Sequence, residues 1–126
     1  RVREVVFPLL EKKKRIKLLE PLDYPVLIKL MKRSYIILTD SGGIQEEAPT
    51  FGVPVLVMRN CTERPEGVEA GVAKLVGTQK DTIVKEAIRL LTETEAHAVM
   101  SNRVNPYGDG LAAKRIVSIL LGRLYS

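Results

Sequence analysis

The sequence predicts an α/β domain built on a mostly parallel β-sheet. Two short runs, YIIL at 35–38 and VPVLVM at 53–58, have the nearly unbroken apolar character of strands buried on both faces. A third run, VAKLV at 72–76, has the same character. Segments with helical periodicity or helix-start signals separate these runs. Strands that alternate with helices indicate right-handed crossover connections, and such connections produce parallel neighbours.

The first third of the chain predicts two helices and a further strand. Residues 2–10 place apolar side chains on one face of a short helix that Pro8 confines or kinks. Residues 15–19 have the character of a strand. Asp23 can cap a helix that runs through Met31, with Pro25 in its first turn. The side chains expected to point inward from that helix are Val26, Leu27, Leu30 and Met31.

The remaining helices follow the central strands. Residues 42–48 predict a short helix that Pro49 ends, and Gly52 opens the turn into the next strand. A strongly amphipathic helix begins at Asp81 or Thr82. Its inward face is expected to contain Ile83, Val84, Ala87, Ile88 and Leu91. The last part of the chain predicts a short helix at 93–100, a loop at 105–110 and a closing helix at 111–121.

The stretch LTDSGGIQEE at 38–47 joins the central strand to the helix after it. Asp40 and Ser41 are cap residues, and Gly42 and Gly43 allow a tight turn that leaves backbone N–H groups uncovered. Helix starts carry unpaired donors and a partial positive charge, so a phosphate is stabilised there without a metal. The same turn occurs in α/β domains that bind nothing, so SGG alone does not define a site.

Other polar groups are expected to converge on this turn. Glu46 and Glu47 lie on the first turns of the helix, and the segment RNCTERPE at 59–66 follows the next strand. In a parallel sheet both turns open at the carboxyl ends of their strands, which is the usual place for ligands. The sequence therefore predicts an anion site between these two turns.

Composition indicates one compact globular domain. The chain has 126 residues, 45% of them apolar, and no apolar run approaches the ~20 residues that span a bilayer. The start of the chain lacks the apolar core of a signal peptide, so we expect a cytoplasmic protein without a membrane partner. The single Cys61 cannot form an internal disulfide, in agreement with a reducing compartment.

Charge is uneven along the chain. Of a net charge of +5, residues 1–35 hold ten Lys or Arg against four Asp or Glu, whereas residues 36–126 hold ten against eleven. The run Lys12 to Arg15 could meet nucleic acid, but such runs are more often a solvated helix end. Only Tyr24 and Tyr35 lie near it as stacking aromatics, and no nucleic-acid module is recognisable. We therefore expect no nucleic-acid partner.

Five linked motifs resemble the non-hydrolysing UDP-N-acetylglucosamine 2-epimerase family. They are LTDSGGIQEEAP at 38–49, GVPVLVMR at 52–59, TERPE at 62–66, LVGT at 75–78 and NPYGDG at 105–110. The resemblance runs from residue 2 essentially to the end of the chain. It implies a Rossmann-like, three-layer parallel sheet, with residues 1–126 forming most of the C-terminal domain of a two-domain fold of the glycosyltransferase B type.

The resemblance also implies an activity: reversible interconversion of UDP-N-acetylglucosamine and UDP-N-acetylmannosamine, in polysaccharide biosynthesis. Elimination of UDP gives a 2-acetamidoglucal, and re-addition follows with the other face of C2 protonated. The acid/base carboxylates of the family come from the N-terminal domain, so no catalytic residue is assigned within residues 1–126. The parent enzyme is expected to be a homodimer that uses neither a metal nor a cofactor.

The resemblance places five substrate-binding residues in this chain. By matching positions, Ser41, Gly42 and Gly43 hold the diphosphate of UDP through a hydroxyl and helix-start N–H groups. Arg64 adds a guanidinium fork, which recognises phosphate better than a lysine does. Glu47 accepts hydrogen bonds from the two ribose hydroxyls.

Each assignment has a purely structural alternative. Ser41 could serve only as a helix cap, and Arg64 could pair with Glu63 or Glu66 at the surface. Glu46 is expected to face solvent or to pair locally on its own helix. In the family, NPYGDG marks the turn into the last helix, which favours structural roles for Tyr107 and Asp109.

The chain departs from the family pattern at two positions. Leu27 stands where an aromatic residue beside the uracil is expected, and Cys61 stands where threonine is expected, which argues against a nucleophilic cysteine. His97 is expected on an exposed helix face without a metal ligand or triad partner beside it.

Two other functions remain open from the motifs. One is the nucleotide-sugar-binding half of a glycosyltransferase of similar fold, and the other is a non-catalytic binding module. A glycosyltransferase would share the phosphate turn but need not combine TERPE with NPYGDG, so the motifs favour the epimerase.

Overall fold

The computed structural model describes residues 2–124, and the side chains of residues 3–122. The chain divides into two compact units, residues 1–30 and 31–126, and each is described by itself. Helix α2 (Tyr24–Arg33) begins in the first unit and ends in the second. No helix in the described part of the chain is long and apolar enough to cross a membrane.

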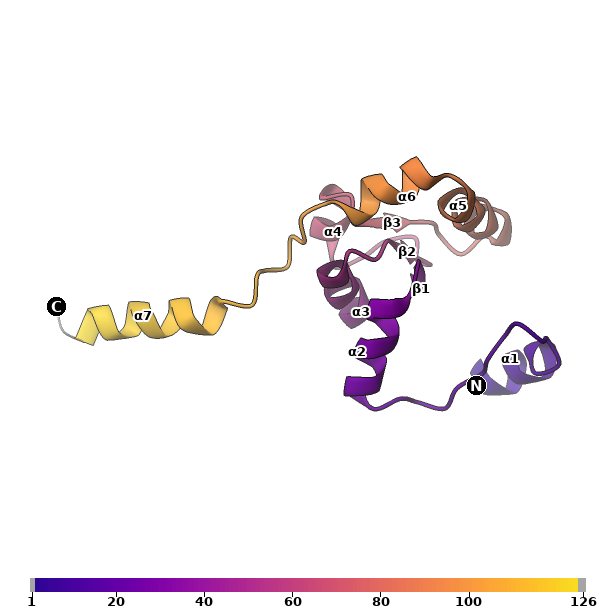
Figure 1. Ribbon diagram of the computed structural model, residues 1–126, viewed down its shortest axis with the longest axis horizontal. Helices are drawn as coiled ribbons and strands as arrows, with labels where there is room; N and C mark the ends of the chain where they lie inside the picture. The colour runs from indigo at the N-terminus through magenta and orange to yellow at the C-terminus, as the bar shows by residue number, and fades with distance from the viewer. Residues whose placement is uncertain (1, 125–126) are drawn as a thin grey trace. The chain divides into compact units, whose positions relative to one another are not determined.

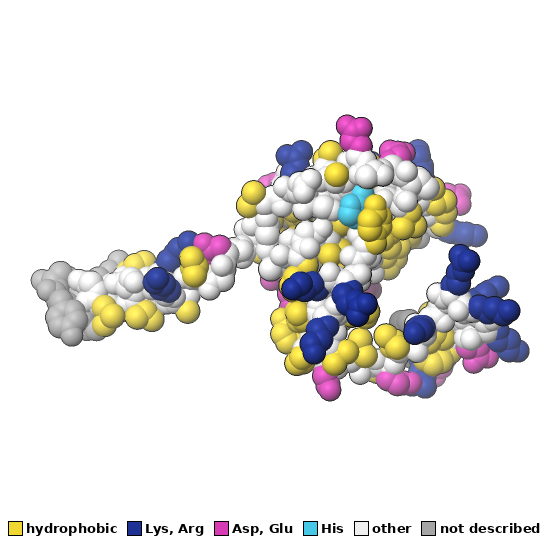
Figure 2. All heavy atoms as spheres, viewed as in Figure 1, with side chains coloured by type: hydrophobic (Ala, Val, Ile, Leu, Met, Phe, Trp, Pro, Cys, Tyr) yellow, Lys and Arg dark blue, Asp and Glu magenta, His cyan; other side chains and the backbone are white. Residues whose placement is uncertain are grey.

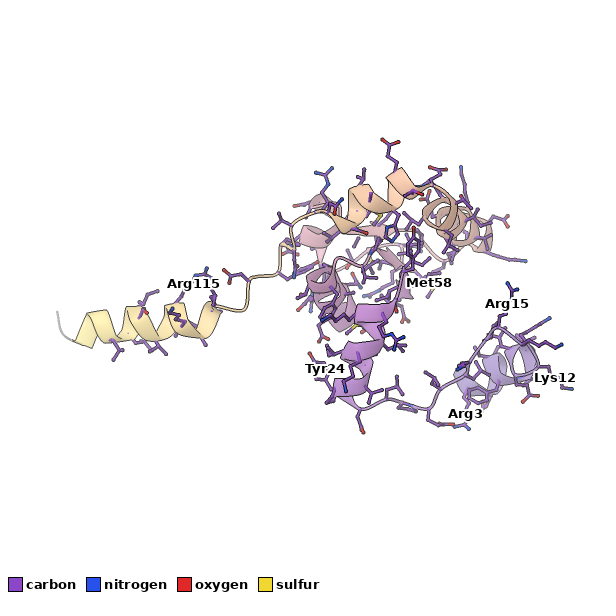
Figure 3. The ribbon with its side chains drawn as sticks, in the orientation of Figure 1. Arg3, Lys12, Arg15, Tyr24, Met58 and Arg115 are labelled. Atoms are coloured by element: carbon purple, nitrogen blue, oxygen red, sulfur yellow. The ribbon has the colours of Figure 1, made fainter. Side chains whose placement is uncertain are left out.

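The first unit contains helix α1 (Val2–Leu10), which has the predicted bounds and includes Pro8. The predicted strand at 15–19 is wrong, because this segment forms no regular element. A strand requires a hydrogen-bonded neighbour, and the described residues provide none for this segment. The side chains of Lys12 and Arg15 are exposed and point outward from this unit (Figure 3).

Helix α2 starts as predicted, with Pro25 in its first turn. The carbonyl of Asp23 accepts hydrogen bonds from the amides of Val26 and Leu27, each at 3.0 Å. Met31 is buried, in agreement with the predicted inward face. Val26 and Leu30 are about half exposed, so the inward assignment is wrong for these two side chains.

The second unit contains a three-stranded parallel sheet. Its strands are β1 (Ile37–Thr39), β2 (Val55–Val57) and β3 (Ala73–Leu75), in the order β1-β2-β3. Leu38 lies beside Leu56, and Leu56 beside Lys74. All three residues of the central strand β2 are fully buried. The predicted α/β class with a parallel sheet is therefore confirmed, and each predicted apolar run overlaps one strand.

Helices follow each of the three strands. They are α3 (Gly42–Glu47), the 3₁₀ turn η1 (Ala48–Phe51), α4 (Pro65–Glu69), α5 (Lys80–Thr92), α6 (Thr94–Ser101) and α7 (Ala112–Leu124). Figure 1 shows α3 and α4 next to one another at one side of the strands and α5 at the other. Helix α3 ends at Glu47, before Pro49, as predicted. Pro49 lies inside η1, and Gly52 then turns with the left-handed φ of 66°. Helix α4 was not predicted, because five residues that include a proline carry no visible periodicity.

The hydrophobic core lies between the sheet and helices α5 and α6. It is formed by Leu56, Val76, Leu90 and Met100, with Ile83 and Ala87 packed against them. The predicted inward face of α5 is thus partly wrong, because Leu90 is fully buried while Val84, Ile88 and Leu91 are 45%, 53% and 57% exposed. Residues 83, 87 and 90 and residues 84, 88 and 91 form two neighbouring apolar stripes on one helix. Periodicity alone does not distinguish which stripe meets the sheet.

Candidate functional site

The turn after β1 presents uncovered amides at the carboxyl edge of the sheet. Ser41 precedes α3 with an extended backbone, and its amide donates to Thr39 Oγ1 at 3.0 Å. The first amides of a helix have no intrahelical acceptor, so those of Gly42 and Gly43 remain available. The Ser41 hydroxyl makes no capping hydrogen bond. The alternative in which Ser41 acts through its side chain as a cap is therefore not supported.

Arg64 lies directly over this turn. It precedes α4, and a Cβ atom built on Gly42 would be 3.8 Å from its Nη2 and 3.9 Å from its Cζ. The structure thus brings together two segments that are more than twenty residues apart in sequence, as the parallel topology predicts. Ser41, Gly42, Gly43 and Arg64 form one cluster, which we call the glycine–arginine site.

Arg64 pairs with Glu46 rather than with Glu63 or Glu66. Its Nε donates to a carboxylate oxygen of Glu46, and its Nη1 donates to the carbonyl of Glu63 at 3.2 Å. Glu46 is half-buried, so the expectation of a solvent-facing or locally paired side chain is wrong. The hydrogen bond and charge of Glu46 raise the pKa of Arg64, which keeps the guanidinium protonated.

Arg59 has a separate partner. Its Nη1 and Nη2 donate to the two oxygens of the Glu63 carboxylate, at 2.7 and 2.9 Å. Both carboxylate oxygens of Glu63 are thus bound to Arg59, and Arg64 bonds only to the backbone carbonyl of Glu63. The hydrogen bonds from Arg59 hold the pKa of Glu63 below its usual range.

Glu47 is half-buried on α3 beside the 105–110 turn. It lines a pocket of about 420 Å³ together with Glu46, Thr50, Asn105, Tyr107 and residues 108–110. Two of these lining residues are joined, because Asn105 Nδ2 donates to Thr50 Oγ1 at 2.9 Å. Glu47 therefore lines the same cavity as Glu46, the partner of Arg64.

The NPYGDG motif has the structural roles that were predicted. The Tyr107 hydroxyl accepts from the amide of Gly67 at 2.9 Å and donates to the carbonyl of Arg64 at 3.2 Å. Asp109 accepts from the amide of Leu111 at 3.0 Å and forms a two-point ion pair with Arg115, at 2.6 and 2.8 Å (Figure 3). Tyr107 thus fixes the chain immediately after Arg64, and Asp109 fixes the turn that leads into α7.

His97 is half-buried. The expectation of an exposed helix face is therefore wrong. Its Nε2 donates to the carbonyl of Tyr35 at 2.9 Å, and its Nδ1 is 3.1 Å from Ser101 Oγ. The imidazole also stacks on the ring of Tyr35, with centroids 3.8 Å apart. It is cyan in Figure 2, where hydrophobic side chains border it. His97 therefore connects α6 to the residues just before β1. Among the described residues there is no group of three His, Cys, Asp or Glu side chains that could hold a metal ion.

Two further residues of the site were not singled out from the sequence. Gln45 is 1% exposed on α3, and Thr62 lies in the loop before α4. Thr62 Oγ1 donates to Gln45 Oε1 at 2.6 Å and accepts from the amide of Arg64 at 3.1 Å. The only sequence signal is a polar residue between apolar and acidic neighbours on a short helix, which does not reveal burial.

A parallel sheet with uncovered amides and an arginine at its carboxyl edge is typical of Rossmann-like domains, the class in which nucleotide-binding proteins are common. Comparison with known proteins narrows this class. The sequence model of the family described as UDP-N-acetylglucosamine 2-epimerase matches residues 1–121. The chain belongs to this family.

Individual relatives agree with that assignment. The UDP-N-acetylglucosamine 2-epimerase of Escherichia coli strain K12 is 52% identical over 119 residues, which cover 94% of this chain and 32% of the relative. A structure of MnaA from S. aureus with UDP has a TM-score of 0.91 at 51% identity, covering 98% of this chain and 34% of that one. The UDP-GlcNAc 2-epimerase of Neisseria meningitidis bound to UDP-GlcNAc gives 0.89 at 48% identity, covering 96% and 33%. The chain therefore spans about a third of the length of these relatives.

Proposed function

We propose that this chain is the UDP-binding part of a UDP-N-acetylglucosamine 2-epimerase. Residues 1–126 would form most of its C-terminal Rossmann-like domain, and a further N-terminal domain would face it, as in a glycosyltransferase B arrangement. The observation that carries the proposal is the position of Arg64 over the Gly42 turn. Family membership and the relatives whose structures hold UDP or UDP-GlcNAc support it.

The glycine–arginine site suits a diphosphate. The amides of Gly42 and Gly43 and the hydroxyl of Ser41 donate to phosphate oxygens at the positive end of α3. Arg64 adds charge from the facing loop. Glu46 holds Nε and the Glu63 carbonyl holds Nη1, whereas Nη2 has no hydrogen-bond partner among the described residues and lies beside Gly42. A diphosphate in this position is bound by fixed donors, which is also what a departing UDP requires.

Glu47 is proposed to bind the ribose. A carboxylate has enough acceptor capacity for two adjacent hydroxyl groups, and this use requires no proton transfer. Its half-buried position beside the 105–110 turn places it in a pocket that adjoins the Arg64 partner Glu46. The nucleoside would then lie beside α3, with the diphosphate toward the start of that helix.

The proposed reaction needs UDP both to leave and to return. A base removes the proton from C2 of the sugar while the bond from C1 to the diphosphate oxygen breaks, which gives a 2-acetamidoglucal and UDP. Protonation of C2 from the other face and renewed attack by UDP at C1 give the epimer. Residues 1–126 keep the released UDP bound and stabilise the negative charge that develops on it. The proton-transferring groups are assigned to the N-terminal domain of the whole enzyme. That enzyme would act as a cytoplasmic homodimer.

Calorimetric titration with UDP tests this site. Removal of a charged hydrogen-bonding group typically costs about 1.5–3 kcal/mol, so Arg64→Ala should weaken UDP binding by roughly 10- to 100-fold. Glu47→Ala should weaken both UDP and uridine, whereas Arg64→Ala should spare uridine. The matched controls are Glu95→Ala, at an exposed position on α6, and Arg103→Ala, at an exposed position after it. Unchanged UDP binding in both site variants would remove the assignment.

Activity gives a second test. The chain of 126 residues should bind UDP without interconverting UDP-N-acetylglucosamine and UDP-N-acetylmannosamine. Conversion by this chain alone would show that the proton-transferring groups lie within it. The family match favours the epimerase over a glycosyltransferase of similar fold and over a non-catalytic module.

A further inference from the structure

We infer that Gln45 and Thr62 are positioning residues that hold Arg64 over the Gly42 turn before a diphosphate binds. We call their hydrogen-bonded pair the Gln45–Thr62 link. The inference rests on the proposed function, because it assigns a role within the same UDP site. Neither residue touches the diphosphate in this proposal. Both act through the backbone of Arg64.

The link is a short chain of hydrogen bonds from α3 to the facing loop. Gln45 Oε1 accepts from Thr62 Oγ1 at 2.6 Å, and the same hydroxyl oxygen accepts from the amide of Arg64 at 3.1 Å. The hydroxyl therefore uses its single proton toward α3 and a lone pair toward Arg64. Serine can make both bonds, whereas valine, with a similar shape, can make neither.

The burial of Gln45 indicates that its polar side chain is needed for a hydrogen bond. It is 1% exposed, and its Nε2 has no hydrogen-bond partner within the described part of the chain. A buried, unpaired amide donor costs free energy that an apolar side chain of the same size would avoid. The position is therefore better explained by the bond to Thr62 than by packing.

Arg64 is held at both polar atoms of its backbone. Thr62 binds its amide, and the Tyr107 hydroxyl donates to its carbonyl at 3.2 Å. With the backbone fixed on both sides, the side chain needs only the Glu46 carboxylate and the Glu63 carbonyl to set its direction. A guanidinium that is already in place loses less conformational freedom when a ligand binds. The Gln45–Thr62 link thus increases UDP affinity by preorganisation.

The test is a double-mutant cycle in the chain of 126 residues, with UDP affinity measured by calorimetry. Thr62→Val should weaken UDP binding by roughly 3- to 10-fold, and Thr62→Ser should restore it to within about 2-fold of the native chain. In the Arg64→Ala background, Thr62→Val should cause no further loss, because the residue through which Thr62 acts is gone. Gln45→Met, which keeps the length of the side chain, should resemble Thr62→Val.

Hydrogen exchange reports the link without any ligand. The Arg64 amide should exchange faster in Thr62→Val and Gln45→Met than in the native chain, and Thr62→Ser should protect it again. Amides of the central strand β2 should not change, which excludes general loss of the fold.

The outcomes separate the two proposals. If Arg64→Ala weakens UDP binding but Thr62→Val does not, or if the two losses simply add, the positioning role is overturned and the proposed function stands. If Arg64→Ala alone has no effect on UDP binding, the positioning role is overturned. If Glu47→Ala has no effect either, the proposed site is overturned with it.

Discussion

The side chain of Tyr107 connects the 105–110 turn to the backbone at the start of α4. Its hydroxyl bridges the amide of Gly67 and the carbonyl of Arg64, so the 105–110 turn clamps the first residues of α4. Burial raises the pKa of Tyr107, which keeps the phenol protonated and able to donate at neutral pH. The ring needs the space above Gly67, because a Cβ atom built there would be 2.5 Å from the hydroxyl oxygen.

Gly67→Ala should therefore destabilise the protein, although alanine is the better helix former. Displacement of the Tyr107 ring is an overpacking defect, with an expected cost of about 1–3 kcal/mol in the free energy of unfolding. Urea denaturation measures this cost. Gly122→Ala is the matched control, because a Cβ atom built on Gly122 in α7 meets no neighbour within 4 Å. Equal stabilities for the two variants would contradict the clamp.

Among the elements, β3 and α5 share a largely buried charge. Glu86 on α5 is only 12% exposed, and one of its oxygens lies 2.8 Å from Lys74 Nζ on β3 and 3.0 Å from Arg89 Nε. The hydrogen bond from Lys74 is the main reason that the pKa of Glu86 lies below its usual value, with a smaller contribution from Arg89. The sheet and the helix are thus joined by a polar contact at the margin of the apolar core.

Glu86→Gln should remove this contribution at neutral pH. Because folding lowers the pKa of Glu86, its stabilisation is present above the reference value of 4.5 and is lost as pH falls through the lower folded value. We expect the variant to be about 1–2 kcal/mol less stable near pH 7, with the difference shrinking below pH 4.5. Denaturation at several pH values measures this, with Glu95→Gln on α6 as control. A difference that does not depend on pH would contradict the mechanism.

The sequence predicts the strands of this sheet better than the faces of its helices. The runs containing Ile37, Val55 and Ala73 stand out because a strand buried on both sides must be apolar throughout. The run at 15–19 has similar composition but forms no strand, since pairing depends on a neighbour and not on propensity. On α5, Leu90 and Leu91 are equivalent in sequence, and only the packing of the helix on the sheet decides which is buried.

For the molecule as a whole, topology explains why the candidate site was largely predictable. The loops after β1 and β2 must open at the same edge of a parallel sheet, which brings the Gly42 turn and Arg64 together. The partners within that edge were not predictable. Pairing of Arg64 with Glu46, and burial of Gln45 against Thr62, depend on distances of a few ångströms between loops. Residue patterns along a chain do not encode such distances.

The second apolar stripe of α5 leads to a prediction about the whole chain. Val84, Ile88 and Leu91 lie at spacings of four and three residues on one helix face, and all three are about half exposed. Exposed apolar faces of this kind promote association, and β1 at the end of the sheet order has no strand neighbour on its outer side among the described residues. The chain of 126 residues should therefore self-associate as its concentration rises, which analytical ultracentrifugation detects.

The double variant Ile88→Glu with Leu91→Glu should shift this chain toward monomer, because two carboxylates on that stripe oppose burial against a second copy. UDP binding should not change, since α5 contributes no residue to the glycine–arginine site. Val104→Glu is the matched control, because Val104 is 84% exposed but belongs to no stripe, and it should leave association as it was. A native chain that stays strictly monomeric at high concentration would show that the exposed face of α5 does not drive association.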